Sequence, residues 1–302
     1  MLIIRNILPD DIIAYVKILG EIDNVDRLGA VASVEYVAEC LGQPGCYPGE
    51  DLFFAELDGV LVGYASMVRE LEIGRVIVSG AVHPAYRGRG VGSQLLEAAL
   101  SQGYKLEADA VHIPVDYRLL AGEHFVRKKG FRIVCRQWQM NITGYRSGEV
   151  NVPDGFDMGH FVAGDEESLC NLQNLAFAGS WGFRPNSVEE VRYLVSTSCC
   201  HPEGILFLNE GKNKVGYCWT MDHPTEKGRG CIHMMGVHPM YRERGLGRLV
   251  LVAALEYFKQ RGIKEIELVV DSKNRQASHL YRSLGFKRKG RTLWYQRRLA
   301  FD

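Results

Sequence analysis

The sequence predicts an α+β protein made of two tandem domains, and a long internal repeat carries this prediction. The stretch from Ala81 to Gly92 reads Ala-Val-His-Pro-Ala-Tyr-Arg-Gly-Arg-Gly-Val-Gly, and the stretch from Gly236 to Gly247 reads Gly-Val-His-Pro-Met-Tyr-Arg-Glu-Arg-Gly-Leu-Gly. Their first arginines, Arg87 and Arg242, stand 155 positions apart (242 minus 87). A period of this length corresponds to a whole domain and indicates a duplication.

The repeat extends beyond these glycine-rich stretches. At the same offset Val115-Asp116 matches Val270-Asp271, and Lys129-Gly130-Phe131 matches Leu284-Gly285-Phe286. Between the two copies, the polar and glycine-rich segment from Gly144 to Gly155 is the only convincing linker. The predicted domains are therefore residues 1–148 and 149–302.

Composition narrows the class of protein. The chain has 302 residues, with 36 basic and 36 acidic side chains, so neither nucleic acid nor an anionic membrane is expected as a partner. The start, Met-Leu-Ile-Ile-Arg, is apolar only briefly and reads as a strand, not as a signal peptide. Eight scattered cysteines favour reduced thiols and a cytoplasmic location. The run Cys199-Cys200-His201 lacks a partner cluster, so no metal is expected.

Strand and helix signals alternate through the first domain. Pro9-Asp10-Asp11 starts a helix, Asp58-Gly59 marks a hairpin turn, and Gly130 ends a helix. The segment from Gly20 to Gly49 has no clear pattern. The predicted strands are residues 2–5, 52–56, 60–68, 75–82, 106–115 and about 132–142, and the later helices are residues 91 to about 102 and 119–129.

The second domain repeats this order with clearer signals. Ser187 and Glu190 form a predicted capping box at the start of a helix. Apolar residues from Leu246 to Phe258 fall at helical spacing, and Gly262 ends that helix. The predicted strands are residues 156–162, 205–209, 214–221, 231–237 and 266–270, and the predicted helices are 165–177, 187–195, the one after 246, and 274–283.

Each glycine-rich stretch joins a strand to a helix and suits a phosphate group. The first turn of a helix has unpaired N–H groups and a partial positive charge, which together attract an anion. Gly245 and Gly247 remove side chains that would keep a diphosphate away from the backbone. Arg242, Arg244 and Arg248 add positive charge around the same turn.

These residues resemble the acetyl-CoA signature Gln/Arg-x-x-Gly-x-Gly/Ala of the GCN5-related N-acetyltransferases (GNAT). In the second copy, the later residues Asn274, Ala277, Leu280-Tyr281 and Leu284-Gly285-Phe286 resemble a further family segment. The resemblance covers nearly the whole chain as two GNAT-like domains, an architecture similar to the mycothiol synthases. It implies a mixed sheet with splayed central strands and acetyl-CoA as cofactor. The residues expected to bind it in the second domain are Met235, Gly236, Val237, Arg242, Glu243, Arg244, Gly245, Leu246, Gly247 and Asn274.

The resemblance also implies direct attack of a neutral amine on the thioester. Backbone N–H groups near Met235 and Val237 would stabilise the oxyanion, and Tyr281 would protonate the departing thiolate. Each role has a structural alternative, because Tyr281 on an amphipathic helix can be a core aromatic and Asn274 can cap its helix. His83 and His238 are expected to be turn residues.

The general base is less clear. Tandem members of the family tend to carry a glutamate on the strand before the motif, where this sequence has Cys231. Period-2 alternation predicts that Cys231, His233 and Met235 share one face. His233 is therefore the candidate base, with a purely structural histidine as the alternative and with Asp222 and His223 as other candidates.

The two copies are not equivalent. At the offset of 155, Tyr281 corresponds to Val126, Asn274 to Leu119 and Ala277 to Gly122. The second domain is therefore expected to be catalytic, whereas the first either binds acetyl-CoA without turnover or serves as a scaffold. Its candidate cofactor residues are Val82, Arg87, Gly88, Arg89, Gly90, Val91 and Gly92.

The expected function is an acetyl-CoA-dependent N-acetyltransferase acting on a small-molecule amine. The stretch from Asn174 to Val191 is where the family places acceptor-binding helices, so Trp181, Phe183 and Arg184 are candidate pocket residues. A catalytically weakened CoA-binding sensor or scaffold, or a protein N-terminal acetyltransferase, stays open as an alternative. The oligomeric state is open between monomer and homodimer.

Overall fold

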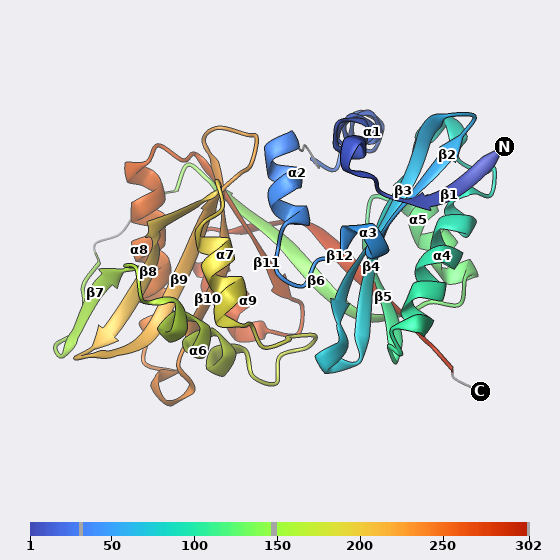
Figure 1. Ribbon diagram of the computed structural model, residues 1–302. Helices are drawn as coiled ribbons and strands as arrows, with labels where there is room; N and C mark the ends of the chain where they lie inside the picture. The colour runs from blue at the N-terminus through green and yellow to red at the C-terminus, as the bar shows by residue number, and fades with distance from the viewer. Residues whose placement is uncertain (30–32, 146–149, 301–302) are drawn as a thin grey trace. The chain divides into compact units, whose positions relative to one another are not determined.

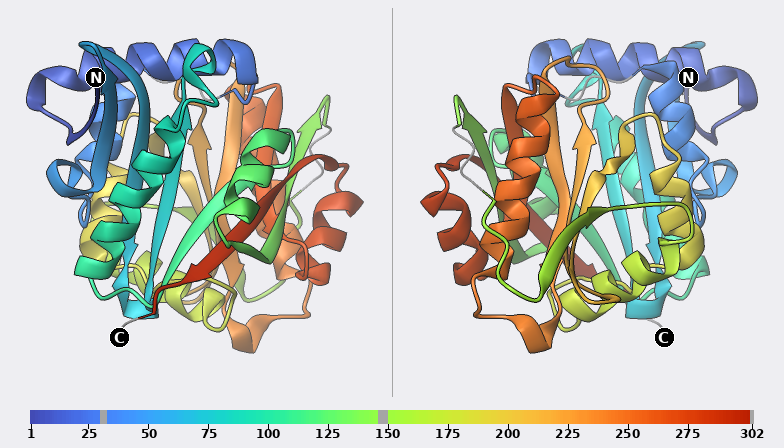
Figure 2. Two further views of the ribbon diagram at one scale, coloured as in Figure 1. Left: turned by 90° about the vertical axis from the view of Figure 1, so that its right-hand side faces the viewer. Right: turned by 90° about the vertical axis from the view of Figure 1, so that its left-hand side faces the viewer.

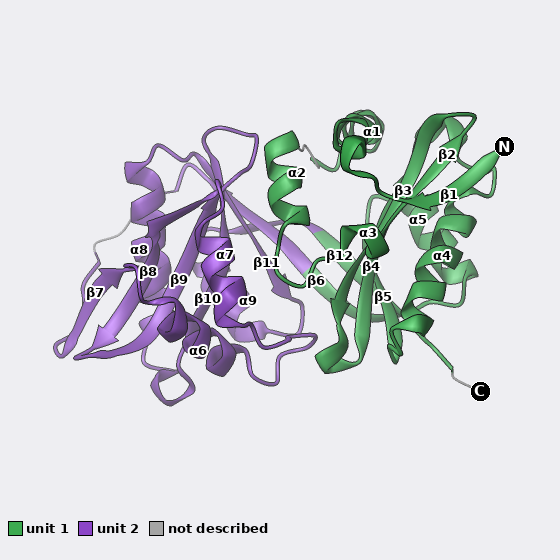
Figure 3. Ribbon diagram, in the orientation of Figure 1, with its two compact units in different colours: residues 1–137, 291–302 green, residues 138–290 purple. Residues whose placement is uncertain are grey.

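The computed structural model describes residues 1–29, 33–145 and 150–300. The chain forms two compact units, unit 1 with Met1–Gln137 and Arg291–Asp302, and unit 2 with Trp138–Gly290 (Figure 3). The predicted boundary between residues 148 and 149 falls outside the described residues. No helix in the described part of the chain is both long and apolar enough to cross a bilayer.

Unit 1 contains a mixed sheet in the order β1-β2-β3-β4-β5-β12 (Figure 1). The β4–β5 pair is parallel, and the pairs β1–β2, β2–β3, β3–β4 and β5–β12 are antiparallel. The hairpin between β2 and β3 turns at Asp58 and Gly59, which both have positive φ, as a tight two-residue turn requires. These strands are β1 (Leu2–Asn6), β2 (Leu52–Leu57), β3 (Val60–Glu70), β4 (Arg75–Val82), β5 (Ala110–Asp116) and β12 (Lys287–Arg298).

Helices cover both faces of this sheet. Tyr15, Ile18 and Ile22 of α1 pack with Val37 of α2 against one face, while α4 packs its apolar side on the other. The segment that the sequence left unassigned contains the end of α1, the short helix α2 and the start of α3. The helices of unit 1 are α1 (Ile12–Asp26), α2 (Val34–Leu41), α3 (Pro48–Asp51), α4 (Val91–Lys105) and α5 (Leu120–Lys128).

Unit 2 has the sheet order β6-β11-β10-β9-β8-β7. Helices α6 and α7 lie on one face of strands β8 to β10, and α8 lies on the other (Figures 1 and 2). The predicted capping box is confirmed, because Glu190 N–H donates to Ser187 Oγ at 3.1 Å and Ser187 N–H donates to Glu190 Oε2 at 2.7 Å. The elements are β6 (Arg132–Thr143), β7 (Phe156–His160), α6 (Glu166–Phe177), α7 (Val188–Val195), β8 (Cys200–Glu210), β9 (Asn213–Asp222), β10 (Arg229–Val237), α8 (Leu246–Gln260), β11 (Glu265–Asp271) and α9 (Arg275–Ser283).

The final strand of each repeat contributes to the other unit. The sequence did not predict β12, which follows Gly285 and pairs antiparallel with β5 from Thr292 opposite Asp116 to Arg298 opposite Ala110. Its Leu293 and Tyr295 are buried in the core of unit 1. Conversely, Met140 and Ile142 of β6 are buried in the core of unit 2.

The central parallel strands separate in both units, as expected for the fold. In unit 2, β10 pairs with β11 only from Arg229 to Cys231, although β10 continues to Val237. In unit 1, β4 pairs with β5 only from Arg75 to Ile77 and continues to Val82. The predicted mixed, splayed sheet is confirmed.

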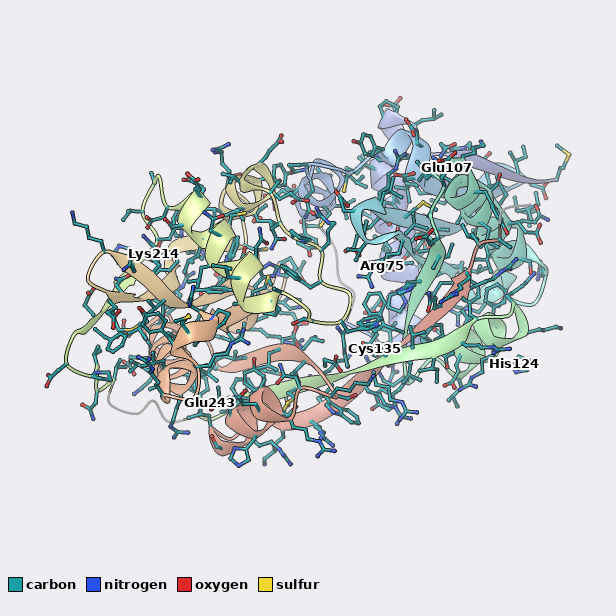
Figure 4. The ribbon with its side chains drawn as sticks, turned by 90° about the horizontal axis from the view of Figure 1, so that it is seen from below. Arg75, Glu107, His124, Cys135, Lys214 and Glu243 are labelled. Atoms are coloured by element: carbon teal, nitrogen blue, oxygen red, sulfur yellow. The ribbon has the colours of Figure 1, made fainter. Side chains whose placement is uncertain are left out.

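The burial of His112 on β5 leads us to expect that the stability of the protein depends on pH. The side chain is 7% exposed, its Nδ1 lies 3.2 Å from Nη1 of Arg75, labelled in Figure 4, and desolvation followed by the Arg75 charge lowers its pKa to about 4. The unfolded chain binds a proton at this histidine near pH 6.5, whereas the folded chain binds it only near pH 4. The free energy of unfolding therefore falls as the pH is lowered from 6.5 to 4, and below pH 4 this contribution is constant. Replacing His112 with Gln is expected to remove up to about 3 kcal/mol of this decline, measured by urea unfolding at pH 7, 5.5 and 4. Parallel curves for both proteins would contradict the assignment.

Candidate functional site

The turn from β10 into α8 forms a backbone cradle in unit 2. Glu243, labelled in Figure 4, and Gly245 both have positive φ, 64° and 79°, and Gly245 is the N-cap of α8. In unit 1 the corresponding residues Gly88 and Gly90 have φ of 77° and 84°. The two cradles therefore share one backbone conformation, and each leads into the first turn of a helix, whose N–H groups are of the kind that bind anions.

The first arginine of each motif connects its cradle to the first helix of its repeat. In unit 2, Arg242 Nη2 donates to the carbonyl oxygen of Ala176 at 2.6 Å, and Nε donates to that of Val237 at 3.3 Å. In unit 1, Arg87 donates to both carboxylate oxygens of Asp26, at 2.9 and 2.6 Å. Each arginine joins the end of a central strand to the end of the first helix of its repeat.

The histidines of both motifs are turn residues, as the sequence predicted. Nδ1 of His238 accepts from the backbone N–H of Met240, and Nδ1 of His83 accepts from that of Ala85, each at 3.3 Å. The N–H of His238 donates to Val215 O of β9 at 2.8 Å. Because successive N–H groups of a strand alternate in direction, those of Val237 and Met235 point to the opposite, open edge of β10.

A β-bulge interrupts β10 at His233. Ile232 lies opposite Thr220 and Met234 opposite Trp219, so His233 is the extra residue. His233 contacts Trp219, with ring centroids 5.1 Å apart, whereas Met235 packs in the core on the α8 side. The prediction that Cys231, His233 and Met235 share one face is therefore wrong for Met235, because the extra residue shifts the alternation.

His233 combines solvent access with a crowded environment. The side chain is exposed, yet the protein surrounding it is dense enough that desolvation lowers its pKa to about 4. Low-dielectric protein around the ring, which includes Trp219, disfavours its charged form. The imidazole is therefore neutral at pH 7 and has a free lone pair for a proton.

Cys231 does not replace a glutamate as a base. Burial, then the nearby charge of Glu267, raises the pKa of its thiol to about 12. Glu267 itself is the residue of β11 that pairs with Cys231, and it accepts from Arg229 Nη2 at 2.8 Å. Sequence reasoning missed this carboxylate because its position depends on the register of two strands that are far apart in the chain.

Tyr281 and Asn274 lie on and before α9. Tyr281 is 7% exposed, burial and the neighbouring Cys218 raise the pKa of its phenol, and its ring lies 5.9 Å from that of Phe286. Oδ1 of Asn274 accepts from Ala277 N–H at 3.0 Å, so this residue caps the helix. The phenol therefore remains protonated at neutral pH and can donate a proton.

Several other candidates have structural partners. Asp222 accepts from Arg261 Nη2 at 2.7 Å, and Nδ1 of His223 accepts from the N–H of Glu226 at 3.0 Å. In the predicted acceptor segment, Arg184 pairs with Glu190 and Phe183 stacks on Phe177 at 5.5 Å. Trp181 is half-buried. These contacts define the local structure of the loop and leave the acceptor role of the segment a prediction.

Unit 1 contains a cavity of about 690 Å³ beside its own cradle. Arg87, Gly88, Gly90 and Gly92 line one part of it, and mostly apolar side chains of α1, β3, β4, β5, α4 and α5 line the rest, together with the carboxylates of Asp23, Asp26 and Asp116. The splay of β4 and β5 opens this space. Its size is typical of a small-molecule site.

Gly236 is required by close packing beneath β10. A Cβ there would lie 2.6 Å from Cβ of Ala176 and 2.9 Å from Cε1 of Tyr217. We expect Gly236→Ala to lower stability by about 1–3 kcal/mol through overpacking, measured by thermal unfolding. Gly247→Ala is the matched control, because its Cβ would meet other atoms only at 3.7 Å or more. Equal melting temperatures for wild type and Gly236→Ala would refute this reading.

Comparisons with known proteins agree with this geometry. Residues 167–286 match the acetyltransferase (GNAT) family and residues 48–133 match an acetyltransferase (GNAT) domain. The chain is 32% identical over 231 residues to mycothiol acetyltransferase of Thermobispora bispora, covering 72% of this chain and 74% of the relative. It is 30% identical over 283 residues to that of a Nocardioides species, covering 86% and 94%.

Solved structures show the same architecture. A GCN5-related N-acetyltransferase from Sphaerobacter thermophilus has a TM-score of 0.79 at 25% identity, covering 100% of this chain and 97% of the other. A tandem GNAT protein from the clavulanic acid biosynthesis pathway has a TM-score of 0.80, with full coverage of both chains at 16% identity, which establishes fold alone. This chain belongs to the GNAT acetyltransferase family, as an enzyme with two tandem GNAT domains that uses acetyl-CoA.

Proposed function

We propose that the second repeat transfers the acetyl group of acetyl-CoA to the amine of a small molecule. The observation that carries this proposal is the bulged strand β10, which leads into a cradle and packs in the same core as Tyr281. Bulges concentrate beside active sites, where they redirect side chains. In the first repeat the β3–β4 ladder runs without a shift from Arg75 to Val82, and Val126 stands in place of Tyr281.

The chain would hold acetyl-CoA along β10 and at the start of α8. The N–H groups of the first turn of α8 bind the diphosphate, favoured by the positive end of the helix. The open edge of β10 offers Met235 and Val237 N–H groups to an extended pantetheine arm, as a sheet edge does to an added strand. Acetyl-CoA supplies the acetyl group as a thioester.

The same backbone would assist the transfer. The amine adds to the thioester carbonyl, whose oxygen becomes negative and is stabilised by an N–H of β10. Tyr281 gives its proton to the departing sulfur, and burial keeps the phenol protonated until then. Placing both reactants in one site removes most of the entropic barrier to their encounter.

His233 would take the proton that the amine must lose. Its ring is neutral at pH 7, so it does not repel a protonated amine, and the bulge turns it to the side of Trp219. Glu267 is a second proton acceptor close to Cys231 on the neighbouring strand. A binding-only sensor or scaffold is the competing function, and it is favoured by the cysteine at position 231.

The acceptor is inferred only as a class. The similar curated proteins are named mycothiol acetyltransferases, which supports a small, polar amine over a protein N-terminus. The segment with Trp181 and Phe183, on the α6 side of β10, is the proposed wall of the acceptor site.

Tyr281→Phe tests catalysis in the second repeat. Removing the phenolic hydroxyl is expected to lower kcat by about 10²-fold or more, while the KM for acetyl-CoA changes little, because the proton is needed only as sulfur leaves. His233→Gln is expected to lower kcat/KM with the amine. Thiol release from acetyl-CoA with an amine panel measures both. Unchanged kcat in Tyr281→Phe would exclude the acid role, and no turnover by wild type with any amine would favour the binding-only function.

The first repeat is proposed to keep acetyl-CoA binding without turnover. Its cradle has the same backbone conformation as the second, and a cavity adjoins it. Val126 has no proton to donate, so the thiolate would not be protonated there.

Matched substitutions separate the two sites. Gly90→Val and Gly245→Val each place a β-branched residue where φ is near +80°, which forces the cradle to change its backbone. We expect calorimetric titration to show two acetyl-CoA equivalents in wild type and one in each variant, with the larger loss of turnover in Gly245→Val. One equivalent in wild type would refute binding by the first repeat.

A further inference from the structure

We propose that the cavity of unit 1 is a binding site for CoA thioesters with an apolar acyl group longer than acetyl, such as butyryl. This inference rests on the proposed binding of CoA by the first cradle, and it adds a ligand specificity that differs from that of the second repeat. The site would bind such a thioester without turning it over.

The two repeats can be compared position by position at this site. An added Cβ on Gly92 would meet Val82 Cγ2 at 3.6 Å and Phe125 Cζ at 3.8 Å. An added Cβ on Gly247 would meet Val237 Cγ2 at 3.8 Å and Leu280 Cδ2 at 3.7 Å. Each contact of unit 1 therefore has its counterpart 155 positions later, which places Val126 where unit 2 has Tyr281.

At four of the cavity-lining positions, unit 1 has a smaller side chain than the core of unit 2 has at the corresponding position. They come from three strands or helices, β3, β4 and α5, and all line the same space. In unit 2 their counterparts include the phenol of Tyr281, the thioether of Met235 and the thiol of Cys218, which pack together in the core. The pairs, unit 1 first, are Ala65 and Cys218, Gly80 and Met235, Gly122 and Ala277, and Val126 and Tyr281.

The freed space is apolar and lies between the splayed strands. Val78 of β4, Val115 of β5 and Leu95 of α4 line it together with Val126. The acyl end of a thioester held by the cradle would enter this region, because the pantetheine arm follows β4 away from Gly90. Burying a CH₂ group in such surroundings favours binding by about three- to fourfold.

Charge limits the kind of acyl chain. The arginine of the cavity, Arg87, is already paired with Asp26, and the carboxylate of Asp116 is paired with Arg118. An acyl chain that ends in a carboxylate would therefore lose its hydration among apolar side chains without gaining a cationic partner. Butyryl-CoA and succinyl-CoA, whose acyl groups have equal carbon counts, form a matched pair of probes for this effect.

The test uses full-length Gly245→Val protein, in which the cradle of unit 2 is blocked. We expect calorimetry to give butyryl-CoA about tenfold tighter binding than acetyl-CoA, from two further buried CH₂ groups, and succinyl-CoA weaker binding than butyryl-CoA. Adding Val126→Tyr, which restores the residue of unit 2, is expected to abolish the preference for butyryl-CoA. Val126→Ala is the opposite variant and should extend the preference to hexanoyl-CoA.

The outcomes separate this inference from the proposed function. If Gly245→Val protein binds no CoA at all, the proposed binding by the first repeat fails. If it binds CoA but shows equal affinity for acetyl-CoA and butyryl-CoA, only the acyl specificity is overturned. If Val126→Tyr prevents folding, Val126→Ala alone still tests the inference. An unchanged acyl preference in that variant would contradict an acyl pocket at Val126.

Discussion

Both repeats depend on the early separation of two parallel strands. After three residue pairs, β10 leaves β11 and β4 leaves β5, and each then has an open edge inside its unit. Backbone N–H groups at such an edge need partners, which water or an extended ligand can provide. The cradle, the donors of Met235 and Val237, and the cavity of unit 1 all follow from this separation.

The surroundings of the open edge differ between the two repeats, and the differences come from a few residues. One extra residue in β10 turns His233 out of the regular alternation, whereas β4 has none. Gly236 lets Ala176 and Tyr217 approach β10 closely, and unit 1 has Ala81 at the same place. Tyr281 closes the space that Val126 leaves open. The proposed division of labour, with proton transfer in the second repeat and binding in the first, rests on these small differences.

The two-domain fold and many helix boundaries could be predicted from the sequence, because they depend on residues that are close together in the chain. Gly130 signals the end of α5, Ser187 and Glu190 signal a helix start, and the repeat identifies corresponding residues. The bulge at His233, the pairing of Glu267 with Cys231 and the engagement of Arg242 by Ala176 could not be predicted. They depend on register and on contacts between distant segments, for which alternation of side chains in one strand is no guide.

The strand β12 has a consequence for how the chain is made. Unit 1 includes Arg291–Asp302, whereas every residue of unit 2 lies between Trp138 and Gly290. Synthesis proceeds from the N-terminus, so the repeat that is translated first is the last to receive all its strands. Leu293 and Tyr295 reach the core of unit 1 only after all of unit 2 has been synthesised. A gene divided at the repeat boundary would therefore encode two incomplete sheets. The two repeats can no longer be separated without loss of a strand from each.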